Sequence, residues 1–263
     1  MRSVEELALS YVRSGRRSLG QHFLTDPGVL DRIVLEVAAL RPHVIVEIGV
    51  GFGVLTERFC SVADRVIGVE KDPRLFRIAR TRLRALRGLD LLLGDALEVD
   101  LPRDAVVAGS PPYSISTELV KKLIFGQTEW WVLMFQREFY AKLALLPEDS
   151  DRSHLSALAA LAGETSLLMD VSRQSFYPPP EVDSALVRFH FTNPHGLTTD
   201  GFRALSDFLF RLFTDHRRRK ARGALRSLAG PAPAAPDNWG ERRVFELTSS
   251  ELLEMFHLAR RAE

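Results

Sequence analysis

The sequence of 263 residues is poor in cysteine and lysine and has no long apolar run. Its single cysteine, Cys60, has no partner for an internal disulfide and no cysteine or histidine cluster around it, so we expect a small core residue and no metal site. No N-terminal stretch has the order of a signal peptide, and no apolar run approaches the roughly 18 residues that a membrane span needs. A cytoplasmic protein without membrane contact is therefore expected.

The charges are nearly balanced over the whole chain, with a net charge of +1, but they are unevenly distributed. Residues 1–25 carry four Arg and two Glu, and residues 195–263 carry twelve Lys and Arg against nine Asp and Glu, so the part between them is acidic. Two basic ends suit a polyanionic partner such as a nucleic acid. Helices with solvated charged faces would give similar sums, so this alternative stays open.

Short apolar runs alternate with amphipathic helical stretches between residues 43 and 191. This alternation is typical of an α/β fold, in which helices cover a mostly parallel sheet. Residues 184–191 (SALVRFHF) favour a half-exposed antiparallel strand that closes the sheet. The other expected strands are 43–48, 65–70, 89–93, 104–109 and 130–135, and the expected helices include 27–40, 53–62 and 73–86.

A turn cluster at residues 193–196 (NPHG) separates this region from a C-terminal part of different character. Residues 199–228 and 249–261 have helical periodicity, and a Pro/Ala-rich loop at 229–240 lies between them. The sequence therefore predicts a small all-α domain, with a continuous basic helix around residues 217–226.

A glycine-rich turn follows the first expected strand. Gly49, Gly51 and Gly53 let the backbone turn sharply and approach a ligand closely, next to the N–H groups that start a helix. A dinucleotide-binding fingerprint would need glycine where the chain has Val54. Gly-x-Gly-x-Gly after the acidic Glu47 instead favours S-adenosylmethionine, although a glycine turn taken alone could be structural.

Carboxylates end the next two expected strands. Glu70, 21 residues after Gly49, stands where an acid can accept hydrogen bonds from ribose hydroxyls. Asp95, followed by Ala96, lies at the sheet edge where open α/β sheets bind ligands, and it could accept from the adenine amine of the cofactor. Either acid alone could be a helix cap, but the glycine turn and both acids in this order favour a cofactor site.

The fourth expected strand ends in Ser110-Pro111-Pro112-Tyr113, which suits methylation of an exocyclic adenine amine. The lone pair of this amine is delocalised into the ring, so acceptors on its N–H groups are needed to aim the lone pair at a sulfonium methyl group. The backbone of Pro111 is restricted by its own ring and by Pro112, so its carbonyl is held as one acceptor. Ser110 can supply the second acceptor, and Tyr113 an aromatic face for an extruded base.

These motifs together resemble the ribosomal RNA adenine dimethyltransferase family, which modifies two adjacent adenines near the 3′ end of small-subunit rRNA. The similarity begins at residues 20–24 (GQHFL), continues through the motifs above, and includes residues 176–184 (FYPPPEVDS), similar to the family's Phe-x-Pro-x-Pro-x-Val-Asp-Ser. The family usually has Asn-Leu-Pro-Tyr where this chain has Ser-Pro-Pro-Tyr. Because serine is shorter than asparagine, the role of Ser110 stays open.

The resemblance implies a Rossmann-like class I methyltransferase and direct methyl transfer to RNA without a covalent intermediate. It divides the chain into a basic arm (1–25), a methyltransferase domain (26–194) and a helical RNA-recognition domain (195–263), in a monomer that acts on rRNA within an assembling ribosomal subunit. Phe176 would stack on the target base opposite Tyr113. The residues implied to bind or border S-adenosylmethionine are Gln21, His22, Leu24, Gly49, Gly51, Glu70, Asp95, Ala96 and Ser110.

Basic residues at both ends of the chain are expected to hold RNA phosphates, although structural ion pairing is an alternative for each of them. They are Arg13, Arg16, Arg17, Arg217, Arg218, Arg219, Lys220, Arg222 and Arg226.

Three other functions fit part of the sequence. An erythromycin-resistance methylase would share the fold and chemistry, but residues 217–225 resemble the Arg-Arg-Lys-x-Leu segment of the housekeeping family. A catalytically idle RNA-binding relative would not need the intact acids and the Pro-Pro-Tyr segment. A NAD-dependent dehydrogenase would leave Asp95 and that segment unexplained.

Overall fold

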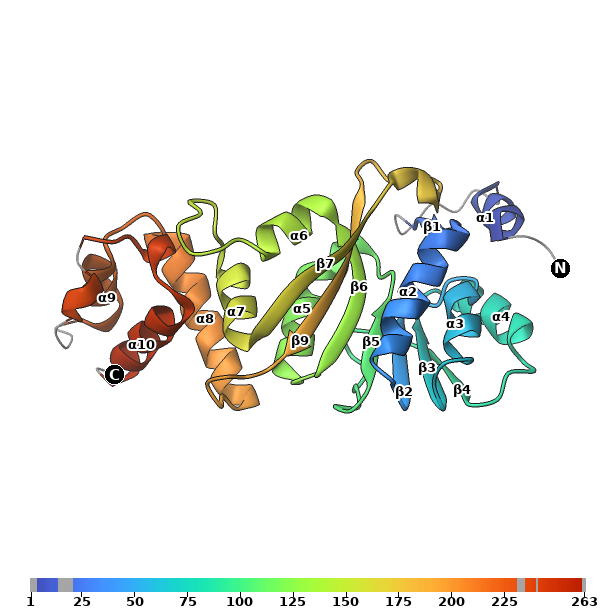
Figure 1. The fold of residues 1–263 in the computed structure, drawn as a ribbon, viewed down its shortest axis with the longest axis horizontal. Coiled ribbons are helices and arrows are strands. Elements are labelled where there is room, and N and C mark those ends of the chain that lie inside the picture. The colour runs from blue at the N-terminus through green and yellow to red at the C-terminus, as the bar shows by residue number, and fades with distance from the viewer. Residues whose placement is uncertain (1–3, 14–20, 231–234, 240, 262–263) are drawn as a thin grey trace. The chain divides into compact units, whose positions relative to one another are not determined.

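A computed structural model describes residues 4–13, 21–230, 235–239 and 241–261, which belong to two compact units (Figure 1). Unit 1 consists of Met1–Arg137 and Ser166–His190, and unit 2 consists of Glu138–Thr165 and Phe191–Glu263. This division differs from the boundary expected at residue 194. Residues 138–165 group with the C-terminal helices because they include α7 (His154–Ala162), which packs against those helices.

Unit 1 is built on a seven-stranded sheet with the order β4-β3-β2-β5-β6-β9-β7. The strands β2 to β6 are parallel, and β9 pairs antiparallel with β6, as the alternation of residues 184–191 predicted. The one strand of this sheet that the sequence did not indicate is β7, whose residues form neither an apolar run nor a regular alternation. The strands are β2 (Val44–Ile48), β3 (Arg65–Glu70), β4 (Leu89–Leu93), β5 (Val106–Gly109), β6 (Trp130–Gln136), β7 (Gly163–Val171) and β9 (Ser184–Phe191).

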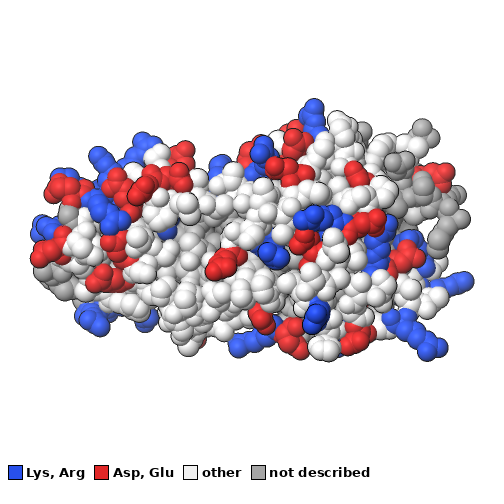
Figure 2. Space-filling model, viewed as in Figure 1, with Lys and Arg blue, Asp and Glu red and all other residues white. Residues whose placement is uncertain are grey.

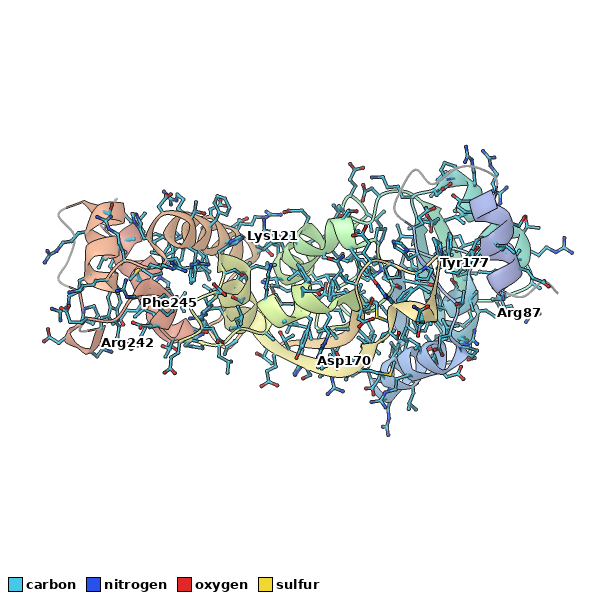
Figure 3. The ribbon with its side chains drawn as sticks, turned by 90° about the horizontal axis from the view of Figure 1, so that it is seen from above. Arg87, Lys121, Asp170, Tyr177, Arg242 and Phe245 are labelled. Carbon is cyan, nitrogen blue, oxygen red and sulfur yellow. The ribbon has the colours of Figure 1, made fainter. Side chains whose placement is uncertain are left out.

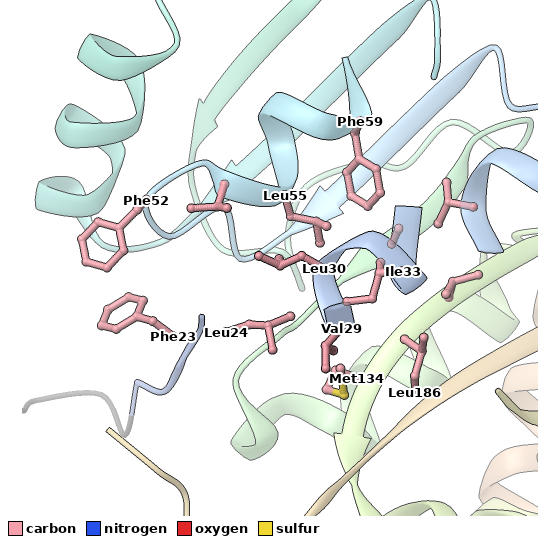
Figure 4. Close-up of a cluster of buried hydrophobic side chains, with 14 of the residues drawn as sticks. Phe23, Leu24, Val29, Leu30, Ile33, Phe52, Leu55, Phe59, Met134 and Leu186 are labelled. Atoms are coloured by element: carbon pink, nitrogen blue, oxygen red, sulfur yellow. The ribbon is translucent and has the colours of Figure 1, made fainter. Parts of the chain in front are cut away.

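Helix α2 (Pro27–Ala39) shows how the helices of unit 1 attach to the sheet. Asp26 caps its first turn by accepting hydrogen bonds from the N–H groups of Gly28 and Val29. Its buried side chains recur every three or four residues, and Figure 4 shows Leu30 and Ile33 within the apolar cluster that includes Phe59. The other helices of unit 1 are α1 (Val4–Arg13), α3 (Val54–Phe59), α4 (Pro73–Arg82) and α5 (Ser116–Phe125), with 3-10 turns η1 (Tyr113–Ile115) and η2 (Arg173–Ser175).

The beginning of the chain is joined to a segment about 150 residues away. β1 (Phe23–Leu24) pairs antiparallel with β8 (Phe176–Tyr177), so the two motifs expected at 20–24 and 176–184 lie side by side. Residues 4–13, expected to be part of a basic arm, form α1, and Tyr11 donates a hydrogen bond of 2.5 Å to Asp72. Burial, followed by the neighbouring Asp72, raises the pKa of Tyr11 to about 12.

Unit 2 has its own apolar core, formed mainly where α7 (His154–Ala162) packs against α8 (Thr199–His216). In the same unit, the fully buried Arg152 donates a hydrogen bond to the Leu247 carbonyl. Burial lowers the pKa of Arg152 to about 10. The remaining elements are α6 (Arg137–Leu143), α9 (Ala221–Ala229) and α10 (Ser249–Arg260), with 3-10 turns η3 (Asp237–Trp239) and η4 (Val244–Glu246).

The prediction of a continuous basic helix at 217–226 was wrong. α8 ends at His216 and α9 begins at Ala221, so the residues between them lie outside both helices. Their backbone pairs instead with residues 242–245: the N–H of Val244 donates to the carbonyl of Arg219, and Ala221 donates to Arg242. These nonlocal hydrogen bonds replace the helical ones that the sequence pattern indicated.

Within the described residues, no helix is both long and apolar enough to cross a membrane, and no three His, Cys, Asp or Glu side chains are grouped to hold a metal ion. Cys60, expected to be a small core residue, is partly buried and packs against the main apolar cluster, and its burial raises the pKa of its thiol.

Candidate cofactor and active site

The glycine turn lies directly beside the Ser-Pro-Pro-Tyr segment. The parallel register pairs Ile48 with both Val69 and Gly109, so β2, β3 and β5 end at the same edge of the sheet. Gly49 has a φ of +81°, and a Cβ atom added there would lie 3.4 Å from the carbonyl oxygen of Ser110. The left-handed backbone and this close approach explain why glycine is needed at the position.

Glu70 joins the glycine turn to the loop that follows β3. Its side chain is only 6% exposed, and its two oxygens accept hydrogen bonds of 2.8 Å from the N–H groups of Gly51 and Asp72. Burial raises the pKa of Glu70, while these two N–H groups act in the opposite direction. Each oxygen keeps a second lone pair that can accept a ribose hydroxyl.

Asp95 is held from two sides at the end of β4. Its Oδ1 accepts from the N–H of Leu97 at 2.9 Å, and its Oδ2 accepts from the ammonium of Lys71 at 2.6 Å. Lys71, and then the Leu97 N–H, hold the pKa of Asp95 below its usual value. The carboxylate therefore stays ionised, which suits it to accept a hydrogen bond from an adenine amine.

The aromatic ring of the Ser-Pro-Pro-Tyr segment has a fixed partner. The Tyr113 hydroxyl lies 2.5 Å from the hydroxyl of Ser184, which ends the motif at 176–184 and is fully buried. Burial raises the pKa of Tyr113, although the hydrogen bond to Ser184 opposes the shift. The two motifs are thus connected at the site, and Tyr113 is anchored by its hydroxyl end.

The motif at residues 20–24, which the structure describes from Gln21 onward, lies at the same site. Its histidine, His22, places Nδ1 2.7 Å from the carbonyl oxygen of Pro178. Because a carbonyl only accepts, Nδ1 carries the proton in this contact. The contact adds to the β1–β8 pairing and fixes the motif next to the glycine turn.

Three adjoining pockets surround these residues, and two of them hold about 550 and 620 Å³ of free space, part of which is open to solvent. All the residues expected to bind or border the cofactor line at least one pocket: Gln21, His22, Leu24, Gly49, Gly51, Glu70, Asp95, Ala96 and Ser110. Pro111, Pro112 and Tyr113 line the same space. The sequence analysis did not single out Phe23, Lys71 and Leu75, which also contribute to the walls.

Phe176 differs from the other expected site residues. Its side chain is 2% exposed and belongs to the main apolar cluster, and it does not line any of the three pockets. The register of β1 and β8 places Phe176 opposite Leu24 and Tyr177 opposite Phe23, so the backbone of Phe176 pairs with a pocket residue while its own side chain stays in the core. The structure therefore gives Phe176 a packing position, and stacking on a base would require it to leave the core.

Glu47, which the sequence analysis used only as the acid before the glycine turn, is itself a pocket residue. It lies on β2 among apolar neighbours, is 1% exposed, and its Oε2 has no hydrogen-bond partner among the described residues. Burial raises the pKa of Glu47 to about 8. The side chain of Thr56 opposes this shift, and the nearby charge of Glu70 adds to it. The available signal was a single acid within an otherwise apolar strand, since such a position is costly for a charged group.

The expected RNA-binding residues are only partly described. Arg16 and Arg17 lie outside the described residues, and Arg13 ends α1 without a described side chain. In unit 2, Lys220 pairs with Glu241 and Arg222 pairs with Asp237 at 3.5 Å. The other basic residues of this segment, Arg217, Arg218, Arg219 and Arg226, form no ion pair within the described chain, and all but the half-buried Arg217 are exposed.

The strand order, the glycine turn after the first parallel strand and the acids that end the next two define a class I methyltransferase that uses S-adenosylmethionine. The expected Rossmann-like fold is thus confirmed. A family model described as "Ribosomal RNA adenine dimethylase" matches residues 12–231. The chain belongs to this family.

Individual relatives agree with this assignment. A protein of Methanosarcina acetivorans named "Probable ribosomal RNA small subunit methyltransferase A" is 33% identical over 247 residues, which cover 90% of this chain and 91% of the relative. The crystal structure of a dimethyladenosine transferase from Plasmodium falciparum matches with a TM-score of 0.78 and 26% identity, over 92% of this chain and 98% of that one. The 23S rRNA methyltransferase ErmE shares the fold, with a TM-score of 0.64 and 23% identity over 90% and 99% of the two chains.

Replacing either strand-end acid should weaken cofactor binding. We expect Glu70→Gln and Asp95→Asn each to reduce S-adenosylmethionine affinity about 10-fold to 100-fold, because hydrogen bonds to charged groups contribute roughly 1.5–3 kcal/mol. Isothermal calorimetry measures the change. Glu57→Gln, at a half-buried acid that pairs with Arg82 and lines none of the three pockets, is the matched control and should bind normally. Unchanged affinity in both folded variants would show that these acids do not hold the cofactor.

Removing the buried acid at Glu47 should change how stability depends on pH. Since its pKa is raised from 4.5 to about 8, the folded protein binds a proton in this range that the unfolded chain releases. The wild-type free energy of unfolding therefore falls with rising pH, by at most about 1.4 kcal/mol per pH unit from this group. Glu47→Gln lacks this pH-dependent contribution. The free energy of unfolding of the variant minus that of the wild type should therefore increase between pH 5 and 8. Denaturant unfolding of both proteins at several pH values tests this. The same change of unfolding free energy with pH in both proteins would contradict it.

Proposed function

We propose that this protein transfers methyl groups from S-adenosylmethionine to the exocyclic amines of two adjacent adenines near the 3′ end of small-subunit rRNA, in an assembling ribosomal subunit in the cytoplasm. The observation that carries the proposal is the position of the Ser110-Pro111-Pro112-Tyr113 segment, which contacts the glycine turn at Gly49. The pocket has two strand-end acids that suit an adenosine group, and a rigid polar segment lies beside it. This arrangement fits the transfer of a methyl group from one purine-containing molecule to another.

Catalysis would depend on positioning. The cofactor supplies a methyl group on a positively charged sulfur. The hydroxyl of Ser110 and the carbonyl of Pro111 accept hydrogen bonds from the two N–H groups of the target amine and direct its lone pair toward that methyl group. Tyr113, anchored through Ser184, presents its ring to the extruded base. The alkylated amine then loses one proton to water, and the bond from sulfur to carbon is replaced by one from nitrogen to carbon.

The basic segment 217–226, which consists of the link between α8 and α9 and the first part of α9, would provide one contact to RNA phosphates. Its exposed Arg218 and Arg226 lack carboxylate partners in the described chain, which supports this role. Lys220 and Arg222 are already paired with acids, so their contribution would require exchange of one anionic partner for another.

The polar residue before the two prolines should be replaceable only by another acceptor. We expect Ser110→Asn to retain methylation, and Ser110→Val to lose about five-fold or more in rate, because one hydrogen bond contributes about 1 kcal/mol. Mass spectrometry of dimethyladenosine in rRNA from a strain without the modification measures both. Equal rates for wild type and Ser110→Val would mean that the Pro111 carbonyl acts alone. No methylation by the wild type near the 3′ end would refute the proposed function.

The two aromatic residues should respond differently to loss of their rings. Tyr113→Leu should reduce rRNA methylation with little change in cofactor affinity, because base stacking contributes about 1–3 kcal/mol. Phe176→Leu keeps an apolar side chain in the core and should mainly lower the melting temperature. A Phe176→Leu variant with normal melting and strongly reduced methylation would instead show that Phe176 leaves the core to stack on the base.

A further inference from the structure

An arginine-rich segment of unit 1 takes no part in the site described above. Residues 73–88 contain six Arg and no Lys, Asp or Glu. Arg82 is half-buried and pairs with Glu57. The other five are exposed, and no ion pair within the described part of the chain involves them. We call them the α4 arginine stripe: Arg74, Arg77, Arg80, Arg84 and Arg87.

The stripe occupies the solvent side of α4 and the turn that follows it. Arg74, Arg77 and Arg80 are spaced three residues apart, so they share one side of the helix with neighbouring Cβ atoms about 5–6 Å apart. The opposite side is anchored by the buried Leu75 and Ala79. Arg84 and Arg87 extend the row beyond the helix, and Figure 3 shows Arg87 at the outer surface.

Among the described residues, the acids near this segment in sequence form no ion pair with the stripe, and each has another partner: Asp72, which directly precedes the segment, accepts hydrogen bonds from the Tyr11 hydroxyl and the Arg74 N–H. Besides Glu57, Asp64 contacts His43 at 2.9 Å, and Asp90 pairs with Arg65 at 2.7 Å. Figure 2 shows basic side chains projecting from the part of the surface where Figure 1 places α4 and β4. Like charges three residues apart destabilise a helix slightly, so the row does not serve the stability of α4.

The chemistry of the surface fits a row of phosphates. Guanidinium groups bind phosphate oxygens through two parallel hydrogen bonds. None of the exposed large hydrophobic side chains of the described residues lies within 73–88, whereas the core of a protein interface is enriched in apolar and aromatic residues. α4 also begins beside the pocket, since Leu75 lines the same space as Tyr113.

We propose that the α4 arginine stripe binds the phosphate backbone of the rRNA substrate, as an RNA contact separate from the basic segment of unit 2. This inference rests on the proposed function. It assigns a substrate-holding role to the helix that also contributes to the cofactor pocket.

The test compares two charge-matched variants. Arg77→Gln, Arg80→Gln and Arg84→Gln together remove three stripe residues. The control combines Arg32→Gln, Arg65→Gln and Arg203→Gln, each at an arginine paired with an acid. Both variants lose three positive charges, so a difference between them reports direct phosphate contacts instead of net charge. Affinity for a fragment of the 3′ region of small-subunit rRNA is measured over a range of salt concentrations.

We expect the stripe variant to bind the RNA at least roughly ten-fold more weakly than the control at low salt, and to reduce the slope of log affinity against log salt by about 2–3. Its S-adenosylmethionine affinity and melting temperature should match those of the control. Equal RNA affinity and equal slopes would overturn the inference and favour a solvated face or an acidic protein partner. If the wild type binds and methylates the RNA, equal affinities of the two variants contradict only the role of the stripe and not the proposed function. If the wild type neither binds nor methylates the RNA, the proposed function and the inference are both wrong.

Discussion

The site depends on one buried carboxylate. Glu70 ends β3, and its two oxygens hold the backbone of the glycine turn at Gly51 and the start of α4 at Asp72. Two loops from neighbouring strands are therefore fixed by a single side chain that is almost inaccessible to water. A carboxylate that is removed from water in this way needs hydrogen-bond donors at fixed positions to offset its desolvation cost. The two N–H groups that supply these hydrogen bonds also fix the loops beside the pocket, where a ribose can enter.

Much of the fold and cofactor pocket could be predicted because the signals are local. An apolar strand, a glycine turn and an acid at a strand end are each read within a few residues, and parallel pairing then brings the ends of β2, β3 and β5 together. The departures from the expected structure have nonlocal causes. The helix expected across 217–220 is interrupted by pairing with residues 242–245, and the position of Phe176 follows from its pairing with Leu24. Neither partner is indicated by the sequence near the affected residue.

The two units have different physical tasks. All of the residues that line the three adjoining pockets belong to unit 1, whose sheet fixes their positions. Unit 2 has a separate core, in which even a buried guanidinium at Arg152 serves to hold backbone carbonyls. The surface of unit 2 can therefore vary without disturbing the residues that line the pockets.

The contact between His22 and the carbonyl of Pro178 has a consequence for biosynthesis. It closes a loop of 156 residues, and β1 likewise finds its partner only in β8. Contacts this distant in sequence form late, because the entropy of the intervening chain must be lost first. On the ribosome, a nascent chain that has not yet emerged past residue 178 has the glycine turn and both acids, but its pocket residues Gln21–Leu24 lack the partner segment that holds them in place. Completion of the cofactor site thus requires the chain as far as Pro178, when β9 of unit 1 is still to be synthesised.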